Sequence, residues 1–138
     1  MGYIFESLLV GAYTWFIYML FSRFIENLYV LLLVVGFSKH FLGSSLGLHD
    51  WYCNNGEACI KALSQIQNYE ANTLHLIRDS ILEALLFLIV GVILSTCFFI
   101  LTNGILFFSI GVILHIVAEK LLIHKYFCKT SCDVEKSN

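Results

Sequence analysis

The feature that most constrains this chain is a set of apolar segments long enough to cross a membrane. A helix rises about 1.5 Å per residue, so about 20 apolar residues cross the roughly 30 Å hydrocarbon core of a bilayer. Three segments meet this standard, Ile4–Phe21, Ser80–Leu101 and Gly104–Ile123, and Leu28–Leu42 comes close to it. The sequence therefore predicts an all-α, polytopic transmembrane helical bundle in the lipid bilayer, with four spans favoured at about residues 4–21, 28–45, 80–101 and 104–124.

The composition agrees with this class. Hydrophobic residues make up 59% of the chain and charged residues 13%, whereas a soluble domain carries about a quarter charged residues. The formal net charge of −2 argues against a nucleic-acid partner, because nucleic acid selects basic surfaces. With 138 residues, the chain has room for a single membrane domain, residues 1–138.

The number of spans depends on residues 22–27, which interrupt a nearly continuous apolar run from Ile4 to Phe37. One helix over that run would be about 50 Å long, well beyond a bilayer. Two spans joined by a turn solve this, and the second would end with Lys39 reaching the interface. Three spans are the alternative, because the turn lacks Gly and Pro and because Arg23 and Glu26 have the spacing of a helical ion pair.

The clearest predicted reversal is Thr102-Asn103-Gly104. Asn and Gly tolerate the positive φ values of a tight turn, and apolar helices flank them on both sides. Residues 80–101 and 104–123 should therefore form an antiparallel hairpin. It follows that the loop before Ser80 and the tail after Ile123 lie on the same side of the membrane.

The third span contains residues suited to close helix packing. Gly91 and Ser95 have the spacing of small residues that lets membrane helices approach each other, and Cys97 is expected to be a packing residue. The phrase Gly-Val-Ile-Leu starts at both Gly91 and Gly111. We interpret this phrase as coincidence in apolar sequence, because the flanking residues diverge at once.

Polar residues collect in a central segment, 46–79, and in a tail, 125–138. From Ala58 to Ile77 apolar residues recur at near-helical spacing, which predicts an amphipathic helix that continues into the third span. In the four-span arrangement, all Lys and Arg residues except Arg23 border this segment or the tail: Lys39, Lys61, Arg78, Lys120, Lys125, Lys129 and Lys136. The positive-inside rule then predicts that both lie on the cytoplasmic face.

Four cysteines form two pairs on that side, Cys53/Cys59 in the loop and Cys128/Cys132 in the tail. A disulfide between Cys53 and Cys59 would close the intervening turn, but it requires an oxidising compartment. A metal site built from both pairs is a second possibility, with His49 or His124 as a further ligand. Free thiols, or an acylated Cys128, are the third.

Four spans, and a loop with two cysteines before an amphipathic helix, resemble the membrane thiol oxidoreductases related to vitamin K epoxide reductase. The resemblance implies a redox role for the cysteine pairs. The chain departs from that family in two respects. Its second pair, Cys128 and Cys132, has three intervening residues in a hydrophilic tail instead of a Cys-x-x-Cys at the membrane edge, and its loop follows the second span instead of the first.

Ionisable residues inside a membrane are costly and are candidates for function. Glu83 opens the third span, and His115, Glu119 and His124 lie toward the end of the fourth. The predicted hairpin places Glu83, His115 and Glu119 within reach of each other, where such a cluster could hold a metal or relay protons. The alternative is a structural role, in which Glu119 pairs with a neighbour or fixes the register of its helix.

No catalytic signature is present, and no cofactor is predicted. The leading hypothesis is a structural or assembly subunit of a membrane complex or of an enveloped particle, in a homo-oligomer or with other membrane subunits. One alternative is a thiol-disulfide oxidoreductase that uses the two cysteine pairs. The other is a metal- or haem-binding subunit that uses histidines of the loop side together with Glu119: His40, His49, His115 and His124.

Overall fold

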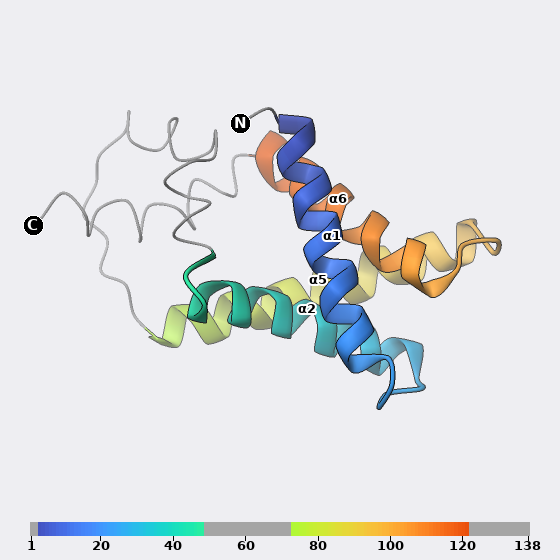
Figure 1. Cartoon of the computed structure of the whole chain (residues 1–138), viewed down its shortest axis with the longest axis horizontal. Coiled ribbons are helices and arrows are strands. Elements are labelled where there is room, and N and C mark those ends of the chain that lie inside the picture. Colours follow the sequence, from blue (N-terminus) through green and yellow to red (C-terminus); the bar gives the residue numbers. More distant parts are fainter. Residues whose placement is uncertain (1–2, 49–72, 122–138) are drawn as a thin grey trace, which may run out of the picture.

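The computed structural model describes residues 3–48 and 73–121, and within these ranges it is helical and has no strand (Figure 1). The described ranges contain four helices: α1 (Tyr3–Phe21), α2 (Leu28–Ser45), α5 (Thr73–Cys97) and α6 (Asn103–Lys120). The predicted all-helical bundle is confirmed at this level. Most of the expected amphipathic helix lies outside the described residues, although α5 runs without a break from Thr73.

The first apolar run breaks into two helices at residues 22–27, where the sequence predicts a turn. Asn27 caps α2, because its side-chain oxygen accepts hydrogen bonds from the backbone N–H groups of Tyr29 at 3.0 Å and Val30 at 3.2 Å. These bonds satisfy two of the donors that a helix start leaves unpaired. A capping asparagine therefore begins the second helix without the help of Gly or Pro.

The second reversal differs from the prediction. The chain turns at Phe98–Thr102, and Asn103 and Gly104 are the first residues of α6. Among the described glycines, only Gly47 has a positive φ, +73°, so Gly104 does not provide the left-handed conformation that we expected. The turn instead exposes Phe98, Phe99 and Ile100.

The most extensive helix contacts join elements that are distant in sequence, α2 with α5 and α1 with α6. Figure 1 shows α2 and α5 extending side by side, and α1 crossing in front of α6. Both pairs are antiparallel: Glu6 near the start of α1 meets His115 near the end of α6, and Gly36 of α2 meets Phe87 of α5. Each helix of the predicted C-terminal hairpin therefore packs mainly against an N-terminal helix.

Glycines permit the close approach of the paired helices. A Cβ atom added at Gly36 would lie 2.8 Å from the Cα of Ala84, and one added at Gly111 would lie 3.1 Å from the Cα of Gly11. Both distances are shorter than ordinary contacts between carbon atoms. At Gly91, which the sequence suggested as a contact, an added Cβ would lie 2.5 Å from a methyl group of Leu32.

The core is a small apolar cluster to which all four helices contribute. Its buried members are Ile17, Leu31, Leu32, Val35, Phe87, Leu106, Phe107 and Ile110. Tyr18 stacks on Phe107 with ring centroids 4.6 Å apart, which joins α1 to α6 near the turns. The bundle is thus held by apolar packing at its centre.

Large apolar side chains that face outward outnumber those of the core within the described residues. Three helices are long and apolar enough to cross a membrane, over Ile4–Phe21, Leu28–Ser45 and Leu76–Cys97, whereas the apolar part of α6, Asn103–Ala118, is shorter. The chain therefore has the character of an integral membrane protein. Cys97, expected to be a packing residue, is exposed at the end of α5.

Candidate functional site

A largely buried carboxylate, Glu83, lies between α5 and α2 and contacts two basic residues of α2. Lys39 donates a hydrogen bond from Nζ to Glu83 Oε1, and His40 Nδ1 lies 2.7 Å from Glu83 Oε2. The three side chains are 14%, 11% and 17% exposed for Lys39, His40 and Glu83, respectively. We call these three residues the Glu83 cluster. Each carboxylate oxygen has a partner, which is what a charge requires when it leaves water.

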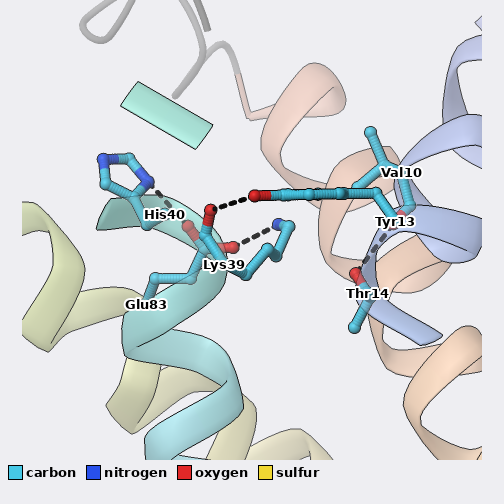
Figure 2. A network of polar contacts seen from close by, with 6 residues as sticks. All are labelled: Val10, Tyr13, Thr14, Lys39, His40 and Glu83. Atoms are coloured by element: carbon cyan, nitrogen blue, oxygen red, sulfur yellow. Dashed lines mark hydrogen bonds and ion pairs between the residues drawn. The ribbon is translucent and has the colours of Figure 1, made fainter. Parts of the chain in front are cut away.

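The surroundings of the Glu83 cluster extend to α1. Figure 2 shows the ring of Tyr13 reaching from α1 toward α2, where its hydroxyl donates a hydrogen bond of 3.3 Å to the backbone carbonyl of Lys39. The ammonium of Lys39 also lies 5.6 Å from the centroid of the Phe87 ring, within range of a cation–π contact. The cluster therefore connects α1, α2 and α5.

A second carboxylate–histidine contact joins α1 and α6. Glu6 Oε2 lies 3.8 Å from His115 Nε2, and the side chains are 1% and 2% exposed. The two groups form an ion pair when the imidazole is protonated. We call these two residues the Glu6 pair. It corresponds to the contact of Glu83 with His40, to which the Glu83 cluster adds Lys39.

The structure separates two residues that the sequence suggested as neighbours. Glu83 contacts residues of α2, and His115 contacts Glu6 of α1. Glu119 lies in α6, but its side chain is outside the described part, as are His49, His124 and the cysteines Cys53, Cys59, Cys128 and Cys132. Among the described residues, no three His, Cys, Asp or Glu side chains gather where they could hold a metal ion. The predictions that involve the undescribed residues stay predictions.

Sequence reasoning missed the partners of both carboxylates. Lys39 was expected at the interface with its amine in water, but it turns inward to Glu83 because that carboxylate needs a cation. Glu6 was not recognised as a partner of His115. A usable signal was present, since Glu6, Lys39 and His40 all interrupt apolar runs and such residues usually face the interior of a bundle.

The outer surface between α2 and α5 is hollowed. An apolar groove of about 280 Å3 is lined by Leu33, Val34, Phe37, Ser38, Ile81, Ala84 and Leu85. We call it the α2/α5 groove. Its lining contains two small residues, Ser38 and Ala84, of the kind that permits close approach of another helix in a membrane.

Comparisons of the chain with protein-family models, with curated proteins and with solved structures find no match. Function is therefore inferred from two features of the chain itself. One is the pair of buried carboxylate sites, and the other is the apolar outer surface with its groove.

Proposed function

We propose that the chain is a four-span membrane subunit that acts through helix packing in a larger assembly, first of all with further copies of itself. The outer surface supports this proposal. Exposed apolar side chains such as Phe16, Tyr29 and Ile89 occur on α1, α2 and α5, while the buried carboxylates are paired between helices. In a membrane, association depends on close packing rather than on exclusion of water, and the α2/α5 groove offers a shape for it.

The four-span arrangement is supported by the pairing of α6 with α1. Contacts between these helices extend from the Glu6 pair at one end to the stacked rings of Tyr18 and Phe107 at the other. Because α1 is long enough to cross a bilayer, an antiparallel helix that follows it over this length crosses most of the same thickness. The bias of Lys and Arg then favours a cytoplasmic loop and tail.

The mass of the complex tests the proposed function. Purified in a mild detergent, the full chain should have a protein mass of at least twice the 15.7 kDa of one chain, measured by light scattering with the detergent contribution subtracted. Chemical cross-linking in native membranes should yield a product that contains the same number of chains. A protein that is monomeric in detergent and forms no cross-links in its membrane contradicts the proposal. A complex with different subunits excludes the homo-oligomer but agrees with the proposed role in an assembly.

A matched pair of variants locates the contact. Leu85 and Leu82 are 46% and 50% exposed on the same helix, but only Leu85 lines the α2/α5 groove. Leu85→Trp fills the groove and should reduce the oligomeric fraction, whereas Leu82→Trp should leave it near that of the native chain. Equal effects of both variants would place the contact elsewhere.

A further inference from the structure

The described residues divide into two halves of two helices each, and the second helices of the two halves match in length and in the positions of a glycine and a histidine. The first half is residues 3–48 and the second is 73–121. Both α2 and α6 have 18 residues, and each has Gly at the ninth position and His at the thirteenth, Gly36 with His40 and Gly111 with His115. In each helix both the glycine and the histidine contact the other half.

Burial follows the same correspondence. In each helix the fourth, fifth, eighth and ninth positions are buried, which are Leu31, Leu32, Val35 and Gly36 in α2, and Leu106, Phe107, Ile110 and Gly111 in α6. The first helical turn also matches. Leu31 donates its N–H to the carbonyl of Asn27 at 2.9 Å, and Leu106 donates to the carbonyl of Thr102 at 2.9 Å.

The first helices of the halves correspond around their glutamates. Glu6-Ser7-Leu8-Leu9 in α1 matches Glu83-Ala84-Leu85-Leu86 in α5. Counted from each glutamate, five large apolar side chains are exposed at matching positions: Ile4, Phe5, Leu8, Leu9 and Phe16 in α1, and Ile81, Leu82, Leu85, Leu86 and Ile93 in α5. The eighth residue after each glutamate, Thr14 or Gly91, is buried.

The contacts between the halves are reciprocal. Glu83 of the second half meets His40 of the first, and Glu6 of the first half meets His115 of the second. Gly36 and Gly111 each receive the first helix of the other half, with the contact on α1 displaced by about one helical turn relative to that on α5. Repeated leucines occur by chance in apolar helices, but reciprocal Glu–His contacts at matching positions do not have that explanation.

We propose that the described helices are two copies of one helical hairpin, and that the interface between the copies carries the carboxylate–histidine site twice. Each copy has two helices, so in the four-span arrangement, on which this part depends, both copies enter from the same side and are related by an axis along the membrane normal. Lys39 and Leu114 occupy the same position, the twelfth of α2 and α6. The lysine is therefore an addition to one of two equivalent sites. The repeated phrase at Gly91 and Gly111 is not part of the correspondence.

A lysine placed in α6 at the position that matches Lys39 tests, in the full chain, whether the two carboxylate–histidine sites are equivalent. His115→Ala removes the partner of Glu6 and should lower the melting temperature of the detergent-solubilised protein, measured by size-exclusion chromatography of a fluorescent fusion after heating. Adding Leu114→Lys should recover part of this loss, because the equivalent position in α2 brings Lys39 to Glu83. Adding Ile113→Lys, one position away, should give no recovery. Equal recovery, or none from Leu114→Lys, overturns the proposal.

The reverse substitution provides a test that does not require a new buried charge. Lys39→Leu gives the twelfth position of α2 the residue type that α6 has there, Leu114, and leaves the contact of Glu83 with His40, so the variant should still fold and melt in a single transition. Loss of the folded full-length chain overturns the equivalence. Both tests measure the fold of a single chain, so their results are independent of the oligomeric mass that tests the proposed function.

Discussion

Removing the Glu83 carboxylate should destabilise the bundle more than any other single loss of charge among the described residues. The substitution Glu83→Ala leaves Lys39 and His40 without the group that both contact, and these side chains are only 14% and 11% exposed. Breaking a buried ion pair by deleting one partner costs about 3–5 kcal/mol, because the remaining charge is left desolvated. For a chain of this size, such a loss lowers the melting temperature by roughly 10–20 °C.

The assay compares melting temperatures in one detergent, with Glu26→Ala as the matched control. Glu26 is a carboxylate in the exposed turn between α1 and α2, so its removal should change the melting temperature little. The double variant Glu83→Ala/Lys39→Met removes both charges and should be more stable than Glu83→Ala alone. This difference measures the coupling within the pair.

Two results would refute this reasoning. If Glu83→Ala melts within a degree or two of Glu26→Ala, the Glu83 cluster does not hold α2 against α5. If Lys39→Met gives no recovery in the Glu83→Ala background, the loss comes from a changed shape and not from an unpaired ammonium.

Three further predictions concern the helix contacts, the α2 cap and the sidedness of the chain. Gly36→Ala should cost about 1–3 kcal/mol, because the added methyl group would lie 2.8 Å from the Cα of Ala84, whereas Gly43→Ala, with its nearest atom 3.8 Å away, should be tolerated in the same melting assay. Asn27→Ala should cost about 1 kcal/mol through loss of the α2 cap, and Asn27→Asp should retain most of that stability. In a background without native cysteines, single cysteines at Gln67 and Ser137 should react with an impermeant maleimide from one face, and cysteines at Arg23 and Asn103 from the other. Labelling of Gln67 and Ser137 from opposite faces would exclude the four-span topology.

The helices themselves could be predicted from the sequence because apolar length alone nearly determines them. The segment 28–45 was predicted with the bounds that α2 has, and the first span differs from α1 by one residue. The described part of the third helix starts at Thr73, ahead of the predicted span at residue 80, which agrees with the prediction of an amphipathic helix that continues into this span. Hydropathy shows where a helix meets lipid and not where its hydrogen bonds begin.

The predicted position of the reversal before α6 was wrong, because a preference of two residues for turns was taken to mean that the turn must lie there. Asn103 and Gly104 favour turns, but they can also begin a helix, and here they do. The turn residues Phe98, Phe99 and Ile100 are apolar and carry no turn signal. At the end of a membrane helix such side chains meet the bilayer interface, where exposure of apolar surface costs less than in water.

The partners of the buried charges could not be predicted because they depend on which helices pair. Treating residues 80–123 as a self-contained hairpin leads to a cluster of Glu83 with His115. In the observed pairing each helix packs against one from the other half, so Glu83 contacts Lys39 and His40 of α2, and His115 contacts Glu6 of α1. The local sequence does not show which helices pair. Once the pairs are known, the shared spacing of Gly and His in α2 and α6 agrees with them.

The difference between the two carboxylate sites indicates where the halves have specialised. In the Glu6 pair the carboxylate lies beside an imidazole, which is charged only when it is protonated. At the equivalent site Lys39 adds a second basic side chain that contacts the carboxylate and joins it to α2. The Tyr13 hydroxyl donates a hydrogen bond to the backbone carbonyl of that same lysine, so α1 also contacts α2 at this point. If the halves descend from one hairpin, the lysine at position 39, where the second copy has Leu114, is the change that made their two interfaces distinguishable.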